Sequence, residues 1–219
     1  MINPKDQDLV EAYLMSTDLE SAGLGFEFAY QSQATGMLDA ILAPMEQLIK
    51  RSGDTRVDQL WITWCDQVGI TDQTAKTMHD LFDGAKEPSL IFPTIEKPDP
   101  YIHMQRNPAG EIVRVMHKRE GDNMPAVGEN DCGLFGLSHS TYFKLLRRFS
   151  DFLDAPSSVD NSNQGLTIGA STQERNFLPF ISWMRGKGTV STYRAVDDME
   201  SIGINTIADA QVLAAKLVS

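Results

Sequence analysis

The sequence has few of the features that mark secreted, membrane-bound and nucleic-acid-binding proteins. Its 219 residues include only two cysteines, Cys65 and Cys132, each inside or beside an apolar segment, so we expect two reduced core thiols rather than a disulfide. It has no signal peptide, no lipidation motif and no apolar run approaching membrane-spanning length. A net charge of −11 and a longest basic cluster of residues 117–119 argue against nucleic acid and anionic membranes as partners. These absences favour a cytoplasmic protein.

Several catalytic motifs are missing as well. The four histidines lack metal-ligand spacing, and the chain has neither a Cys-x-x-Cys pair nor a Ser-His-Asp pattern. Zinc-site and hydrolase interpretations therefore receive little support. What is present is ordinary for a soluble globular protein, with 42% apolar and 22% charged residues in a chain long enough to bury the core of one α/β domain.

Helical and strand-like patterns alternate along the chain, which predicts a three-layer α/β fold with a mostly parallel mixed sheet. Two strand-like runs joined by Asn107–Gly110 interrupt this alternation and predict an antiparallel hairpin, so that residues 97–131 would form a ligand-facing lobe of a single domain, 1–219. The predicted helices span residues 8–21, 36–50 with a break at Pro44, 71–84, 140–152, 174–184 and 206–217. The predicted strands span residues 25–31, 60–65, 89–95, 101–106, 111–118, 131–137 and 189–196.

The most informative segment is the apolar run at residues 60–65, which stops at Asp66. Such an aromatic and β-branched run is typical of a buried parallel strand, and an acid at its exit would stand at the ligand-binding edge of the sheet. A second segment places Asn205 just before the last helix, where Thr206 and Asp209 resemble a capping box. If both face one cleft, a carboxylate and an amide carbonyl could hold Mg²⁺ with waters and phosphate oxygens. The alternatives, a turn residue at Asp66 and a helix cap at Asn205, remain open.

Short segments spread over nearly the whole chain resemble the sugar-phosphate nucleotidyltransferases. In chain order they are residues 31–40, where the family has Gln followed by Gly-Thr-Gly and Ala on a helix, then 64–66, 115–118, 131–133, 174–177 and 202–205. Each is weak alone, but the series is similar to the pyrophosphorylase domain of N-acetylglucosamine-1-phosphate uridylyltransferase and to the MobA-like group.

The resemblance implies a Mg²⁺-dependent reaction in which a sugar 1-phosphate attacks the α-phosphorus of a nucleoside triphosphate and expels pyrophosphate. It implies that Asp66 and Asn205 bind the metal and that Lys118 faces a phosphate. The nucleotide would meet Gln31, Gly36, whose missing side chain allows close approach, and Trp64. The sugar-phosphate side would comprise Asp131, Gly133, Glu174 and Asn176, although Glu174 could equally complement a helix dipole.

The chain departs from this family at its start and on its sugar side. It lacks the Gly-rich triphosphate loop, so by the resemblance the first βαβ unit is missing: it has been lost, or it is supplied in trans, or the protein no longer catalyses. Met116 stands where the family has a carboxylate, Asp131 where it has an asparagine and Ile102 where it has a glycine. N-acetylglucosamine 1-phosphate is therefore not favoured as the substrate.

Three functions remain open from the sequence. The first is a nucleotidyltransferase whose partners are a nucleoside triphosphate and a sugar 1-phosphate, and the second is a non-catalytic nucleotide- or sugar-phosphate-binding remnant or partner subunit. The third, a metal-dependent glycosyltransferase of the GT-A type, is weakened because residues 66–68 lack the second acid of an Asp-x-Asp site. An uncovered sheet edge would also allow a homo-oligomer.

Overall fold

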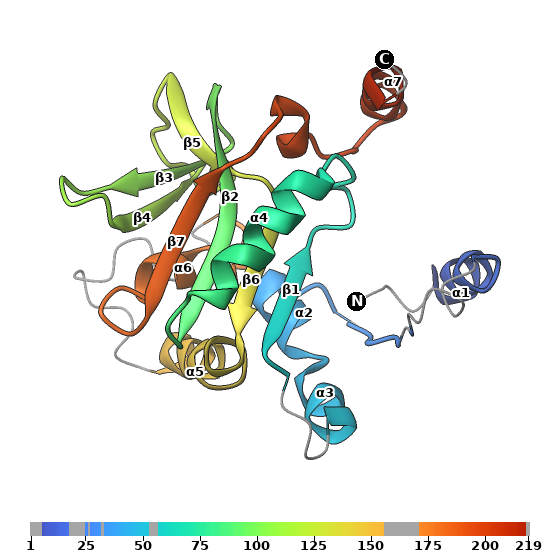
Figure 1. Cartoon of the computed structure of the whole chain (residues 1–219), viewed down its shortest axis with the longest axis horizontal. Coiled ribbons are helices and arrows are strands. Elements are labelled where there is room, and N and C mark those ends of the chain that lie inside the picture. The colour runs from blue at the N-terminus through green and yellow to red at the C-terminus, as the bar shows by residue number, and fades with distance from the viewer. Residues whose placement is uncertain are drawn as a thin grey trace.

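Five strands form one sheet in the centre of the molecule (Figure 1). The structure, a computed structural model, describes residues 6–17, 25, 27–31, 33–52, 57–155 and 171–217. Strand β2 is central, because β6 and β5 pair with one of its edges and β7 pairs with the other, while β1 pairs with β6. The strands are β1 (Gln59–Thr63), β2 (Ser89–Pro98), β5 (Val127–Asp131), β6 (Leu134–Ser138) and β7 (Thr189–Arg194).

The mostly parallel sheet expected from the sequence is not confirmed. Only β2 and β7 pair in parallel, whereas the pairings of β1 with β6 and of β2 with β5 and β6 are antiparallel. Because β6 runs opposite to both of its neighbours, β1, β2 and β7 still point the same way. The carboxyl ends of these strands therefore share one edge of the sheet, which is the edge where α/β folds bind ligands.

Strand β1 is not the buried parallel strand that its apolar run predicted. It pairs antiparallel with β6, and its outer face exposes 42% of Trp61. The same alternation leaves Cys65 exposed, so the prediction of a core thiol is wrong for Cys65 and confirmed for the fully buried Cys132; both are free thiols. A run of apolar letters does not distinguish a strand buried on both faces from one buried on a single face.

A two-residue bulge separates β5 from β6 along the edge of β2. Asp131 pairs with Thr94 and Gly136 pairs with Ile91, so residues 132–135 face only residues 92–93 of β2. Bulges of this kind bend a strand and redirect its side chains. This bulge follows Asp131, at the point where β5 ends.

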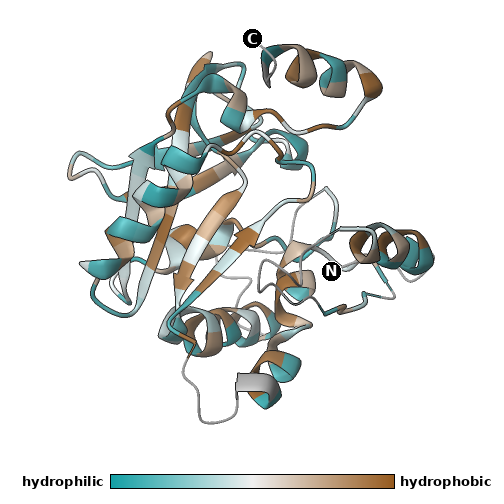
Figure 2. Ribbon diagram, turned by 45° about the vertical axis from the view of Figure 1, so that its right-hand side comes forward, coloured by the Kyte–Doolittle hydropathy of each residue, from teal (hydrophilic) through white to brown (hydrophobic). Residues whose placement is uncertain are grey.

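Helices cover both faces of the sheet (Figure 1). Leu90 and Phe92 of β2 point into the larger core with the helices of one face, while Ile91 packs with Met78 and Phe82 of the helix on the other face. Figure 2 shows apolar residues along the central strands between these helical layers. The larger-core helices are α2 (Met37–Leu42), the π-helical turn η3 (Thr141–Leu146), α5 (Arg147–Asp154) and α6 (Pro179–Trp183), and the opposite helix is α4 (Asp72–Asp83).

The N-terminal part confirms one prediction and overturns another. The helix predicted for residues 36–50 is broken at Pro44, giving α2 and α3 (Met45–Ser52), because proline cannot donate the backbone hydrogen bond of a helix interior. Residues 27–31 form no strand beyond an isolated β-bridge at Tyr30, since an alternating pattern is not sufficient without a continuous ladder. Helix α1 (Gln7–Met15) buries none of its residues, and residues 18–24, which carry the end of the predicted helix, lie outside the described residues.

The predicted hairpin is confirmed. Strands β3 (Ile102–Arg106) and β4 (Ile112–His117) pair antiparallel, and the Asn107 side chain holds the turn by accepting the N–H groups of Ala109 and Glu111 at 3.0 and 2.9 Å. A short 3₁₀ turn, η2 (Lys118–Glu120), follows. The hairpin packs on β5, where the Ile102 N–H donates to Asn130. Its role as a lobe facing a ligand stays a prediction.

The C-terminal elements follow local capping chemistry. A 3₁₀ turn, η6 (Asp198–Ser201), leads to α7 (Ile207–Leu217), whose predicted capping box is confirmed: the Thr206 N–H donates to the Asp209 carboxylate at 2.8 Å, and the Asp209 N–H donates to Thr206 Oγ1 at 3.2 Å. The helix predicted from residue 174 begins only at Pro179, which suits a first helical position. In the described part of the chain, no helix has the length and apolarity needed to cross a membrane.

Candidate functional site

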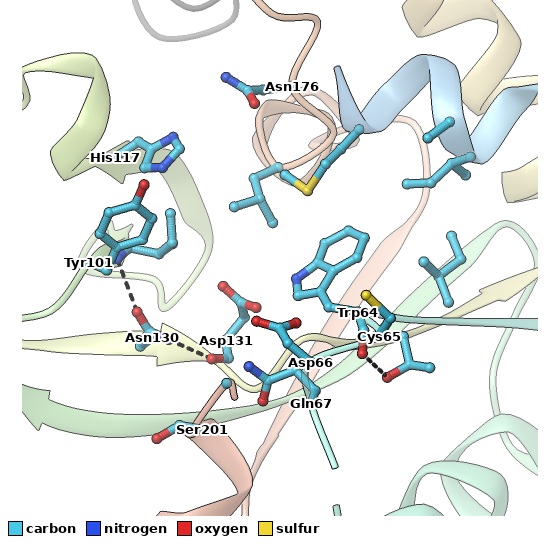
Figure 3. A pocket seen from close by; sticks show the side chains of 18 of the residues that line it. Trp64, Cys65, Asp66, Gln67, Tyr101, His117, Asn130, Asp131, Asn176 and Ser201 are labelled. Carbon is cyan, nitrogen blue, oxygen red and sulfur yellow. Dashed lines mark hydrogen bonds between the residues drawn. The ribbon is translucent and has the colours of Figure 1, made fainter. Parts of the chain in front are cut away.

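A cleft of about 1170 Å³ opens beside the shared edge of the sheet. Its walls come from segments far apart in the sequence: α2 and α3, the exit of β1, the hairpin, the end of β5, and the loops that precede α6 and α7. Asp66 and Asn205 both line this cleft, as do Trp64, Asp131, Glu174 and Asn176. Figure 3 shows the carboxylates of Asp66 and Asp131 on its floor and Asn176 on the opposite side.

Backbone contacts hold the Asp66 loop against residues 203–205. The Ile204 N–H donates to the Asp66 carbonyl at 2.9 Å. The Gln67 amide donates to the carbonyls of Cys132 and Glu200 at 3.2 and 3.1 Å and accepts the Gly203 N–H at 3.3 Å. The absence of a side chain at Gly203 permits this approach, because a β-carbon there would displace Asp66 Oδ2. The Asp66 and Asn205 segments are thus locked together by the fold.

The buried carboxylate of Glu200 holds the segment that precedes Gly203 in place. Glu200 is fully buried and accepts hydrogen bonds from the N–H groups of Val196, Asp197 and Thr71 and from the Thr74 hydroxyl, at 2.8 to 3.1 Å. It therefore ties η6 to the N-terminus of α4, whose predicted start is confirmed by the Thr71 N-cap. This anchor fixes the chain that leads to Gly203.

Asp131 closes the floor of the cleft at the end of β5. Only 6% of it is exposed, and its carboxyl group accepts the Gly133 N–H at 2.8 Å. Burial raises the pKa of Asp131 above its usual range, while the Gly133 hydrogen bond and the charge of Lys97 oppose this rise only in part. Lys97 also lines the cleft, from the end of β2.

Trp64 forms an apolar wall of the cleft. Its ring packs against Phe135 and Phe177, with centroids 5.4 and 6.2 Å away, and the backbone N–H of Trp64 donates to the Gly133 carbonyl at 3.0 Å. Gly133 itself lies behind this wall rather than among the lining residues, because a β-carbon there would come within 2.7 Å of the indole. The ring is therefore rigidly placed by the core.

The hairpin and the loop before α6 meet on the far side of the cleft. Glu174 forms an exposed ion pair with Arg119 at 3.2 Å, and the buried Asn176 donates to Glu120 at 3.4 Å. Burial acts to raise the pKa of Glu120, but hydrogen bonds from Ser171 and Thr172 outweigh it and lower this pKa to about 2. Glu120 thus holds the loop onto the hairpin.

His117 and Tyr101 complete this far side. Their rings meet edge to face, with centroids 4.9 Å apart, and both residues line the cleft. Burial lowers the pKa of His117, which favours the neutral imidazole.

Four predicted site residues do not line the cleft as the structure describes it: Gln31, Gly36, Lys118 and, behind the indole wall, Gly133. Lys118 instead pairs with both carboxylate oxygens of Asp99 at 2.7 and 2.8 Å. Gln31 donates to the Gly36 carbonyl at 3.2 Å. The close approach that Gly36 permits is to the Arg175 backbone, which a β-carbon would overlap, and its φ of +127° also favours glycine. The Arg175 contact and the positive φ thus explain a glycine at position 36 without any contact to a nucleobase.

Sequence reasoning missed two cations that line the cleft, Lys97 and Arg119. The predicted strand at 89–95 ended before Lys97, whereas β2 continues to Pro98. Arg119 lies next to the predicted Lys118, and only the 3₁₀ turn after β4 decides which of the two faces the cleft.

The donor set in the cleft fits a hard divalent cation. Asp66 is half-buried and forms no ion pair within the described residues, while Asn205 is exposed and directs its amide nitrogen to the Gly203 carbonyl at 3.4 Å. Carboxylate and amide oxygens are the ligands that Mg²⁺ takes from proteins. Among the residues that the structure describes, no group of three or more His, Cys, Asp or Glu residues is arranged to hold a metal.

Comparisons with known proteins point in one direction. No family model matches the chain. It is 29% identical over 187 residues to the bifunctional protein GlmU of Lactobacillus gasseri, covering 82% of this chain and 35% of that protein, and the GlmU of Lactobacillus johnsonii gives the same values. The GlmU of Lactobacillus helveticus is 26% identical over 186 residues. The chain thus spans 35% of the length of these curated relatives.

The fold is also similar to a solved structure. The crystal structure of 4-diphosphocytidyl-2C-methyl-D-erythritolsynthase from Anaerococcus prevotii matches with a TM-score of 0.58 at 11% identity, covering 100% of this chain and 80% of that chain. At this identity the match shows the fold alone. With the GlmU similarity it supports a nucleotidyltransferase family, and the resemblance found in the sequence is confirmed.

Proposed function

We propose that this chain, which resembles nucleotidyltransferases in sequence and fold, transfers a nucleoside monophosphate from a nucleoside triphosphate to a sugar 1-phosphate in the presence of Mg²⁺. The observation that carries the proposal is that Asp66 and Asn205, distant in sequence, line one cleft and are locked together through Gly203 and Ile204.

In the proposed reaction an oxygen of the acceptor phosphate attacks the α-phosphorus, and the bond to the bridging oxygen of the β-phosphate breaks to release pyrophosphate. Mg²⁺ held by Asp66 and Asn205 would neutralise phosphate charge. The protein otherwise needs to position two anions in line, for which Lys97 and Arg119 supply positive charge. Contacts of Gln31, Gly36 and Lys118 with the nucleotide or phosphate stay predictions.

The remaining cleft walls divide between the two substrates. Trp64 offers a rigid apolar face suited to the nucleoside. Glu174, Asn176, Tyr101 and the hairpin form the side left for the acceptor, which agrees with the sugar-phosphate role predicted for this part of the sequence. The identity of the sugar is not part of the proposal.

A second candidate is a chain that binds the nucleotide without catalysing transfer alone. The observation behind it is that no Gly-rich triphosphate loop occurs among these 219 residues. In this case another polypeptide would supply the loop.

Calorimetric titration of the full chain with Mg²⁺-nucleoside triphosphates, combined with an assay of pyrophosphate release in the presence of sugar 1-phosphates, tests both candidates. We expect binding that Asp66→Asn weakens by at least about tenfold, equivalent to about 1.4 kcal/mol. Asp83→Asn, an exposed acid at the end of α4, is the matched control and should leave binding unchanged.

The two readouts separate the candidates. Binding with pyrophosphate release supports the transferase. Binding without release supports the non-catalytic candidate. Absence of nucleotide binding, or binding insensitive to Asp66→Asn, would contradict both.

A further inference from the structure

We propose that Asp131 is a third protein ligand of the divalent cation, together with Asp66 and Asn205. The proposal rests on the proposed function. It assigns Asp131 to the metal, whereas the family resemblance placed this residue on the sugar-phosphate side.

The geometry of the floor favours this assignment. Asp66 leaves the end of β1 and Asp131 leaves the end of β5, and both residues line the same cleft, where Figure 3 shows their carboxylates next to each other in the view of the floor. The pairing with β2 continues past Asp131 only through the Cys132 N–H, which donates to the Pro93 carbonyl at 3.3 Å, and the bulge that begins at Gly133 then interrupts it. Bulges beside a site redirect side chains in this way.

The charges on the floor are not balanced by the protein. In the described parts of the chain, no Lys, Arg or His lies within ion-pair distance of Asp66 or Asp131. Lys97 acts on Asp131 electrostatically without forming such a pair. A carboxylate that is only 6% exposed and has no cation within ion-pair distance is costly to keep charged unless a cation binds it.

The hydrogen bond of Asp131 does not account for its charge. The carboxyl group accepts the Gly133 N–H, and the carbonyl oxygen of an asparagine at the same position could accept it equally well. What an aspartate adds is a negative charge. A divalent cation held by two carboxylates and one amide oxygen keeps further coordination positions for phosphate oxygens and water, which suits Mg²⁺.

Titration of the full chain with Mn²⁺ alone, followed by the electron paramagnetic resonance signal of free Mn²⁺, tests the proposal without nucleotide or turnover. We expect Asp131→Asn and Asp66→Asn each to raise the Kd for Mn²⁺ by at least about tenfold, with Asp83→Asn as the unchanged control.

Thermal unfolding gives a second, independent readout. Mn²⁺ should raise the Tm of the unaltered chain, and Asp131→Asn should remove most of this rise. Without metal, Asp131→Asn should have a Tm equal to or above that of the unaltered chain, because a buried charge without an ion-pair partner is gone. If Asp131→Asn does not fold, Asp131→Ser, whose hydroxyl can still accept the Gly133 N–H, takes its place in both experiments.

The outcomes distinguish this inference from the proposed function. If Asp66→Asn loses Mn²⁺ while Asp131→Asn keeps it, Asp131 is not a ligand and the proposed function stands. If both variants bind Mn²⁺ like the unaltered chain, the metal site and the Mg²⁺-dependent function fail together. A Tm that falls equally with and without metal in Asp131→Asn would assign Asp131 a structural role and overturn the inference.

Discussion

Individual glycines decide how closely the segments of the cleft approach one another. Gly203 lies so close to Asp66 that a side chain there would overlap the carboxylate, and Gly36 lies equally close to the Arg175 backbone. The two positions differ in what they touch. Next to Gly203 are the movable ends of two side chains, whereas next to Gly36 is backbone fixed by hydrogen bonds to Thr35 and Leu38.

Gly203→Ala should therefore impair the site more than the fold. The new β-carbon would push away Asp66 Oδ2 and crowd the end of the Gln67 amide, 3.1 Å from it, and both groups can rotate aside. We expect Mn²⁺ affinity to fall by roughly tenfold while the free energy of unfolding changes by less than about 1 kcal/mol. Gly84→Ala is the matched control, because a β-carbon at Gly84 meets nothing within 4 Å. Unchanged metal affinity in Gly203→Ala would show that Asp66 does not bind the metal.

Gly36→Ala should instead destabilise the fold. A β-carbon would collide with the Arg175 backbone at a φ of +127°, where alanine is strained. We expect the free energy of unfolding to fall by about 2 to 4 kcal/mol in urea titrations. If this variant kept its stability and lost only nucleotide affinity, the nucleobase contact predicted from the sequence would be the better explanation of Gly36.

Elements set by local chemistry could be predicted from the sequence, and elements set by distant partners could not. Pro44 breaks a helix and Thr71 caps one without help from the rest of the chain. Strand β5 has the polar sequence VGEND and becomes a strand because β2 lies beside it. Because the sequence does not predict β5, it predicts neither the bulge that follows β5 nor the direction of the Asp131 side chain.

The same distinction applies to the site. Asp66 and Asn205 follow or precede recognisable elements, so their placement in one cleft could be inferred from pattern and family resemblance. Lys118 and Arg119 are neighbours in a 3₁₀ turn, and only tertiary contacts with Asp99 and Glu174 separate their directions. No hydrophobic periodicity in the sequence predicts the directions of these two side chains.

The contact between η2 and the loop before α6 should depend on pH. The pKa of Glu120 is lowered from 4.5 to about 2, so its stabilising contribution is complete above pH 4.5 and is lost as the pH falls toward 2. We expect Glu120→Gln to be less stable than the unaltered chain at neutral pH, with the difference shrinking between pH 4.5 and pH 2. Chemical unfolding of both proteins across this range measures it. A difference that is independent of pH would mean that the hydrogen bonds do not favour the carboxylate.

At the scale of the whole molecule, the charge of the protein opposes the ligand that its cleft is proposed to bind. The chain carries a net charge of −11, and two carboxylates lie on the cleft floor. A nucleoside triphosphate is itself strongly anionic. Lys97 and Arg119 line the cleft, but Arg119 is already paired with Glu174. A divalent cation would reverse the sign of the field where the phosphates must lie.

Removing divalent cations should therefore cost most of the nucleotide affinity. We expect the Kd for a nucleoside triphosphate to rise by at least about a hundredfold when Mg²⁺ is replaced by EDTA, because the phosphates then face the bare carboxylates of Asp66 and Asp131. In Asp66→Asn, which has one charge fewer on the floor, the metal-free affinity should be equal to or higher than that of the unaltered chain, while the gain on adding Mg²⁺ should largely disappear. Calorimetry in both buffers measures the two differences. Equal affinity with Mg²⁺ and with EDTA in the unaltered chain would mean that the triphosphate is held elsewhere, away from the two carboxylates.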